Sequence, residues 1–118
     1  MYTITNYVTE SGRCPYDDFL KLIDKQSPLR RTELETLIKL LKKHGKNINK
    51  YSANAIKYLS GDIWELRPKA NRVLFFFFTE DKIIFLGGHK KSEPKKSVQR
   101  CIAQCQERAN RYKTEMKE

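Results

Sequence analysis

The pattern of apolar and polar residues predicts two helices in the first half of the chain. Apolar residues recur every three to four positions after Pro15 and again after Ser27-Pro28, which is the spacing of one helix face. Gly45 is a natural end for the second helix. That helix can begin either at Ser27-Pro28 or at a capping box formed by Thr32 and Glu35. Two helices joined by a short turn predict an antiparallel helical hairpin.

Strands are predicted before and after this hairpin. We expect them at residues 2–9, 63–67, 72–79 and 82–90, with the last three connected by short turns into an antiparallel meander. Residues 73–78 are apolar at every position, so both faces of that strand must be covered. The helical hairpin can cover one face, and the C-terminal segment or a partner must cover part of the other.

The rest of the chain is expected to hold one long helix and two short segments. Residues 46–50 should form a polar linker, residues 53–59 a short helical turn, and residues 95–117 a helix. The apolar face of this last helix consists of Val98, Cys101, Ile102, Cys105, Ala109, Tyr112 and Met116. The order strand, helix, helix, strand, strand, strand, helix predicts a single α+β domain over residues 1–118. It has a small antiparallel-rich β-sheet, the N-terminal helical hairpin packed on one face, and a C-terminal helix.

Length and composition exclude several classes of protein. The chain has 118 residues, enough for one domain, and 39% of them are hydrophobic, which argues against a disordered polyelectrolyte. The longest apolar run has six residues, whereas a membrane-spanning helix needs about 20. The N-terminus lacks the basic and apolar regions of a signal peptide, so we expect a cytoplasmic protein.

The formal net charge is +10, and the positive charge is concentrated in two stretches, residues 30–50 and residues 89–100. Basic runs often only solvate a surface. Two of them in one small domain favour binding of a polyanion, with nucleic acid as the first candidate. The predicted RNA-binding residues are Lys42, Lys43 and Lys46 in the first stretch and Lys95, Lys96 and Arg100 in the second.

The three cysteines agree with a reducing compartment. Cys101 and Cys105 are four residues apart, so a helix places them on one face. A zinc site wants four ligands, and only His44 and His89 are available as histidines to complete one. We favour the interpretation that both cysteines belong to the apolar helix face, and we expect no metal.

Turn lengths place chemically active residues in one row on the predicted sheet. A four-residue loop pairs Arg67 with Arg72, and a two-residue turn pairs Arg72 with His89 and Phe76 with Phe85. Because side chains alternate between the two faces of a strand, the two arginines and the histidine lie on one face, across three strands.

This row suits an anionic ligand. Glu65 lies one step inward and Lys91 one step outward on the same face. Arginine binds a phosphate through two parallel donors, and histidine transfers protons near neutral pH. With the charge of Lys91, these groups could cleave RNA by attack of its 2′-hydroxyl without a metal. An alternative of equal weight is a solvated sheet end in which Glu65 pairs with one of the arginines.

Three segments resemble the RelE/ParE toxin superfamily, and within it the HigB-like, phage-related branch. They are L-S-G-D-I-W-E-L-R-P at 59–68, N-R-V-L-F at 71–75 and I-F-L-G-G-H-K-K at 84–91. The resemblance implies a toxin of a type II toxin-antitoxin system that cleaves mRNA on the ribosome as an endoribonuclease, without a cofactor. It also implies a cognate antitoxin of the helix-turn-helix type, and it is compatible with a toxin–antitoxin heterotetramer.

The resemblance carries over to individual residues. Arg67 and Arg72 match basic residues of the family's sheet, and Lys90 and Lys91 match its Lys-Lys pair. His89 departs from the pattern, because relatives usually have Phe there. Together these five residues form the candidate catalytic set. Two other functions stay open: a ParE-type toxin of the same fold that inhibits DNA gyrase by binding, without catalysis, and a basic RNA-binding module.

Overall fold

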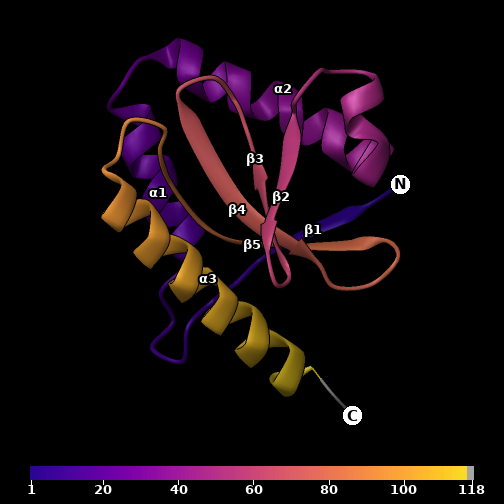
Figure 1. Ribbon diagram of the computed structural model, residues 1–118, viewed down its shortest axis with the longest axis vertical. Coiled ribbons are helices and arrows are strands. Elements are labelled where there is room, and N and C mark those ends of the chain that lie inside the picture. Colours follow the sequence, from indigo (N-terminus) through magenta and orange to yellow (C-terminus); the bar gives the residue numbers. More distant parts are fainter. Residues whose placement is uncertain (117–118) are drawn as a thin grey trace.

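The computed structural model describes residues 1–116. In chain order the elements are β1 (Thr3–Asn6), α1 (Pro15–Asp24), α2 (Pro28–His44), the 3-10 helix η1 (Gly45–Lys50), β2 (Ile56–Ser60), β3 (Ile63–Leu66), β4 (Asn71–Phe77), β5 (Lys82–Lys90) and α3 (Lys95–Glu115). Within these residues a five-stranded sheet has the order β1-β5-β4-β3-β2, with β1 parallel to β5 and the other neighbours antiparallel. Helices α1 and α2 pack on one face and α3 crosses the other (Figure 1). The predicted α+β fold class is confirmed.

The sheet contains one strand that the sequence pattern did not predict. The helical turn expected at 53–59 is wrong, because Ile56–Ser60 forms β2 and pairs antiparallel with β3. The Asn49 side chain binds the backbone of Ile56, the first residue of this strand. Its amide oxygen accepts from the Ile56 N–H at 2.9 Å, and its amide nitrogen donates to the Ile56 carbonyl at 3.0 Å. The linker expected at 46–50 is instead part of η1, where Ile48 is fully buried.

Several element boundaries differ from those expected. The strands expected at 63–67 and 72–79 cover Ile63–Leu66 and Asn71–Phe77. β1 covers only part of the expected 2–9, because its parallel pairing with β5 ends at Asn6. Of the two candidate starts for the second helix, the structure takes the earlier one, since α2 begins at Pro28. The Thr32 hydroxyl donates to the Pro28 carbonyl inside the helix and does not cap it.

Two apolar layers enclose the central strand β4. Val73 and Phe75 face α1 and α2, whereas Leu74 and Phe76 lie beneath α3. These side chains are at most 1% exposed, so the expectation that both faces are covered is confirmed, and the C-terminal helix covers the second face.

The apolar face of α3 includes both cysteines that the sequence placed there. The residues that pack on the sheet are Cys101, Ile102, Cys105, Ala109 and Tyr112. Val98 and Met116 were expected on this face, but Val98 is not among the packed residues and Met116 is 51% exposed. Lys117, the expected last residue of the helix, lies outside the described residues. Among residues 1–116, no helix is long and apolar enough to cross a membrane.

A β-bulge adjusts the register between β4 and β5. Arg72 pairs with His89 as predicted. Further along, Phe76 pairs with Ile84 and not with the expected Phe85. The reason is one extra residue in β5, which forms the bulge. Between the bulge and the β4–β5 turn, the pairing is therefore shifted by one position.

The extra residue is Leu86, which lies between the paired positions Phe85 and Gly87. Its carbonyl accepts a hydrogen bond from Nη1 of Arg108 in α3 at 2.9 Å, so the bulged backbone is not left unpaired. Gly87 has a φ of +152°, a conformation that other residues rarely adopt. The bulge therefore depends on this glycine.

Candidate functional site

One end of the sheet gathers the residues of the predicted row. We call Arg67, Arg72, His89 and Lys91 the arginine end. Arg72 pairs directly with His89 across β4 and β5, and Arg67 follows β3 without a break. The backbone N–H of Lys91 donates to the carbonyl of Ala70 at 2.8 Å, which joins the end of β5 to the turn between β3 and β4. The structure thus places all four residues at the same end of the sheet.

Arg72 is the buried member of the arginine end. It is 7% exposed, and its Nη1 donates to the carbonyls of Lys69 and Asn71, both at 2.9 Å. Burial lowers the pKa of its guanidinium, the carboxylate of Glu65 opposes this shift, and Arg67 adds to it. Arginine stays protonated in proteins. Arg72 is therefore a fixed cation that holds the turn between β3 and β4 in place.

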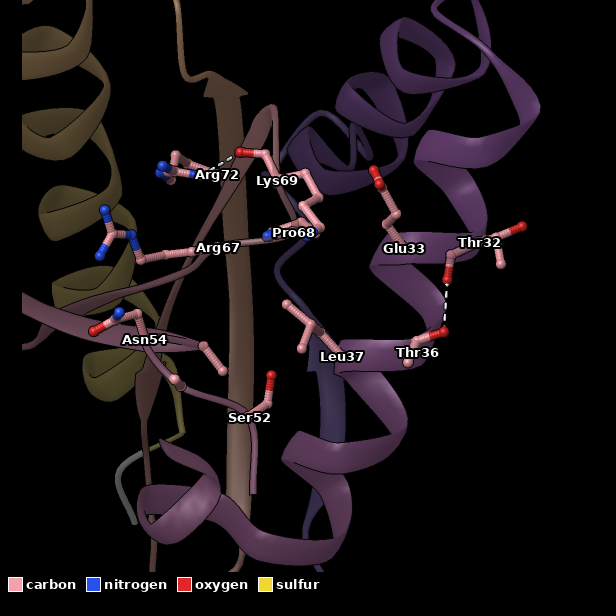
Figure 2. Close-up of a pocket in the computed structure, with 12 residues that line it drawn as sticks. Thr32, Glu33, Thr36, Leu37, Ser52, Asn54, Arg67, Pro68, Lys69 and Arg72 are labelled. Atoms are coloured by element: carbon pink, nitrogen blue, oxygen red, sulfur yellow. Dashed lines mark hydrogen bonds between the residues drawn. The ribbon is translucent and has the colours of Figure 1, made fainter. Parts of the chain in front are cut away.

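Glu65 lies between the two arginines. Its Oε2 is 3.4 Å from Nε of Arg67 and 3.8 Å from Nε of Arg72. The ion pair between Glu65 and an arginine that the sequence offered as an alternative is therefore observed, and Glu65 pairs with both arginines. The side chain of Arg67 is 31% exposed, and its guanidinium points away from α2 (Figure 2). Arg67 is thus the arginine that can contact a ligand.

The turn between β3 and β4 is held by residues that the sequence did not single out. Asn71 is fully buried, and its side-chain amide exchanges hydrogen bonds of 3.0 and 3.2 Å with the amide of Gln26. This pair links the turn to the loop between α1 and α2. Lys69 has a left-handed backbone, with a φ of +57°, and adds an exposed cation. A buried Asn at the start of a strand has no periodic signal, although Asn next to a Pro-containing turn is one cue.

His89 has one ring nitrogen paired and one unpaired. Nδ1 lies 2.8 Å from the carbonyl oxygen of Lys90, which can only accept, so Nδ1 carries the hydrogen. In the neutral ring Nε2 is then an acceptor. Nε2 is buried and has no hydrogen-bond partner among the described residues. Once the His89 side chain turns outward, this nitrogen can take a proton from a hydroxyl group that is brought next to it.

The basic residues near the start of α3 lie at this same end. Lys90 and Lys91 finish β5, and α3 begins four residues later with Lys95. Lys96 and Arg100 follow in its first two turns, and all five side chains are exposed. The second predicted basic stretch is therefore continuous with the arginine end, where it can extend the contact with a polyanion.

The first basic stretch lies elsewhere. We call Lys42, Lys43 and Lys46 the lysine end. The carbonyl of Lys42 accepts from the N–H of Tyr2, just before β1 pairs with the start of β5, and Nζ of Lys46 lies 5.1 Å from the ring centre of Phe77. Arg72 and Phe77 stand at opposite ends of β4. The structure therefore separates the predicted RNA-binding residues into two groups.

A pocket of about 500 Å³ opens beside Arg67. It lies between α2, the loop before β2 and the turn between β3 and β4 (Figure 2). We call it the α2 pocket. Its lining residues are Thr32, Glu33, Thr36, Leu37, Ser52, Ala53, Asn54, Ala55, Arg67, Pro68, Lys69 and Arg72. No pattern in the sequence predicts this pocket, because its walls come from three separate segments. In the part of the chain that the structure describes, no group of three or more His, Cys, Asp or Glu side chains could hold a metal.

Comparison with known proteins identifies one family. A family model described as "Phage derived protein Gp49-like (DUF891)" matches residues 21–110, and this family is associated with RelE-like and toxin-like proteins. No curated protein matches the chain. The matched residues include all of α2, strands β2 to β5 and most of α3, and so contain the whole arginine end. The chain belongs to the Gp49-like family of phage-derived proteins.

Proposed function

We propose that this protein is the toxin of a type II toxin-antitoxin system and that it cleaves mRNA on the ribosome. The observation that carries the proposal is the arginine end, where the unpaired Nε2 of His89 lies in a row with two arginines. Membership of a family associated with toxin-like proteins supports the toxin class, and the resemblance of the strands to HigB-like toxins supports mRNA as the substrate.

In this proposal the bonds change as in other RNA cleavage by an internal hydroxyl. His89 Nε2 takes the proton of the 2′-hydroxyl, whose oxygen bonds to the adjacent phosphorus while the bond from phosphorus to the 5′-oxygen breaks. The leaving 5′-oxygen takes a proton from the ammonium group of Lys90 or Lys91. The guanidinium of Arg67 neutralises the extra negative charge on the phosphorus oxygens. Arg72 is a positioning residue, since its Nη1 already donates to two carbonyls of the turn.

The test is to induce the protein in growing bacteria and map the new 5′ ends of mRNA. We expect cuts within translated messages, and far fewer of them in the variants Arg67→Gln and His89→Gln. Arg111→Gln and His44→Gln are the matched controls, since Arg111 pairs with Glu10 near the end of α3 and His44 stacks on Tyr51 at the end of α2. Intact mRNA together with a DNA-damage response would instead identify a gyrase inhibitor of the ParE type.

We also propose a helix-turn-helix antitoxin as the partner, in a heterotetramer. The net charge of +10 suits an acidic surface on that partner. The partner either covers the arginine end or docks on the helices and keeps the toxin out of the ribosome. Chemical modification separates these modes: Arg67 protected in the complex indicates direct masking, whereas Arg67 reactive in a fully inhibited complex indicates steric exclusion.

A further inference from the structure

The α2 pocket offers a binding site next to the arginine end, and the mechanism above does not use it. Its volume of about 500 Å³ falls in the range of about 300–1,000 Å³ that small-molecule sites occupy. Arg67 lines the pocket and also belongs to the arginine end, but its guanidinium points away from α2 (Figure 2), so a group attached to a ligand in the pocket must pass over the rim to reach it.

The walls of the pocket suit a flat, partly polar ring. Leu37, Pro68 and Ala55 contribute apolar surface, against which the face of such a ring can pack. Hydroxyl and amide groups around them can bond to the ring's edge, and they come from Thr36, Ser52 and Asn54. A nucleobase has this combination of an apolar face and a polar edge.

The rim is formed by two residues with unusual backbone. Asn54 in the loop before β2 and Lys69 in the turn between β3 and β4 both have positive φ, at +59° and +57°. Non-glycine residues in this conformation concentrate at binding sites, where the surrounding structure holds them. Lys69 is held in this way, because its carbonyl accepts from Nη1 of Arg72.

Glu33 supplies the chemistry that can distinguish bases. Its Oε1 accepts from Nη1 of Arg30 at 2.6 Å, which orients the carboxylate, and the side chain is largely buried. Oε2 accepts no hydrogen bond from residues 1–116. It is therefore an acceptor available to a ligand. Guanine presents two donors side by side, N1–H and the N2 amino group, whereas the other bases place an acceptor beside each donor on that edge.

We propose that the α2 pocket binds a guanine base of the RNA, with Glu33 accepting its N1–H and N2–H donors, and so selects the sequence that is cut. The proposal names the substrate contact of the function proposed above and rests on it. The base lies between α2 and the turn, and its phosphate extends over the rim toward Arg67. Glu33 is here a specificity residue and not a catalytic residue.

The first experiment measures binding directly and does not require cleavage. Guanosine, adenosine, cytidine and uridine 3′-monophosphates are titrated into the full chain, and backbone amide shifts are followed by NMR. We expect the guanosine nucleotide to bind about tenfold to a hundredfold more tightly than the others, with the largest shifts at Glu33, Thr36 and Asn54. Equal affinity for the four nucleotides, or shifts confined to the arginine end, would overturn the proposal.

The variant Glu33→Gln sharpens this test. Arg30 will hold the amide oxygen of the new side chain, which leaves the amide N–H₂ facing the donors of guanine, so the preference for guanosine should be lost. Glu35→Gln is the matched control, because Glu35 lies on the same helix, pairs with Arg31 at 3.3 Å and does not line the pocket. An unchanged preference in Glu33→Gln, or an equal loss in Glu35→Gln, contradicts the assignment.

Mapping of cut sites then separates this proposal from the proposed function. If mRNA is cut, we expect guanine to be enriched at one fixed position near the cut, and that enrichment to fall about tenfold in Glu33→Gln while cutting continues. Cutting without any preference for guanine contradicts the pocket proposal alone. If no mRNA is cut, the proposed function fails, and the nucleotide titration still decides whether the pocket binds guanine.

Discussion

The two ends of the sheet both carry positive charge, but they hold it differently. At the arginine end, Arg72 is buried and bonded to two carbonyls, and Glu65 lies between it and Arg67. At the lysine end the side chains are exposed, and Lys46 rests over the ring of Phe77. Charges fixed before binding cost a ligand little ordering entropy, whereas flexible lysines must be ordered by the ligand itself. The comparison therefore favours the first end as the place of the proposed catalysis and the second as a surface for contact only.

Replacing Arg72 should have the largest effect, because it removes the residue that holds the arginine end together. In Arg72→Ala the carbonyls of Lys69 and Asn71 lose their donor, and the buried carboxylate of Glu65 loses one of its two cations. We expect the free energy of unfolding to fall by about 3 kcal/mol and growth inhibition to be lost. Urea unfolding measures the first effect. Full stability in Arg72→Ala would mean that the turn does not depend on this residue.

Replacing Arg67 should separate activity from stability. The side chain is partly exposed, which weakens its ion pair with Glu65, so Arg67→Gln should change the free energy of unfolding by less than about 1 kcal/mol. The rate of RNA cleavage should fall by about 10²–10³, the usual effect of removing one preorganised charge. The rate is measured as cleavage of mRNA on purified ribosomes, with the parent and variant proteins at matched concentrations. A loss of stability equal to that of Arg72→Ala would show that the two arginines have the same structural role.

The salt dependence of ribosome binding compares the two basic groups. Neutralising Lys95, Lys96 and Arg100 together should reduce the slope of log affinity against log salt by about 2, since each phosphate contact contributes roughly 0.7 on single-stranded RNA. The lysine end provides the matched triple variant, with Lys42, Lys43 and Lys46 changed to Gln. We expect a smaller reduction there. Equal reductions would mean that both ends contact RNA to the same extent.

The alignment of Arg72 with His89 could be predicted from the sequence, but two errors in the predicted pairing cancel each other. The predicted two-residue turn is too short, since the structure pairs Phe77 with Ile83. The bulge at Leu86 restores the predicted register before the strand reaches His89. A glycine inside an apolar strand is a known mark of a bulge. The sequence contains that mark, but it does not say which residue is the extra one.

Which arginine is buried could not be predicted, because the answer depends on contacts between distant segments. Arg67 and Arg72 have the same chemistry, and both pair with Glu65. Arg72 is distinguished by its bonds to the carbonyls of Asn71 and of Lys69, whose backbone is left-handed. The bond between Asn71 and Gln26 joins residues 45 positions apart. Such contacts leave no periodic pattern in the sequence. Strand β2 was missed for the same reason, because its first residue, Ile56, is bound by the side chain of Asn49, which lies outside the strand.

The smallest predicted effect concerns an ion pair at the end of the sheet opposite the arginine end. Lys113 and Gln106 lower the pKa of Asp62, which they bind in the turn between β2 and β3. A carboxyl with a lowered pKa in the folded state contributes stability above its unfolded pKa, near 3.9, and this contribution is lost as the pH falls through the lower folded value. Both side chains are well exposed, 39% for Asp62 and 43% for Lys113, so solvent limits the contribution to less than about 1 kcal/mol.

In Asp62→Asn the free energy of unfolding should therefore fall less than in the parent chain between about pH 5 and about pH 3. Glu80→Gln, in the exposed turn between β4 and β5, is the matched control and should keep the parent's acid dependence. If Asp62→Asn instead loses several kcal/mol at neutral pH, this end of the sheet is held as firmly as the arginine end, and the contrast between them disappears.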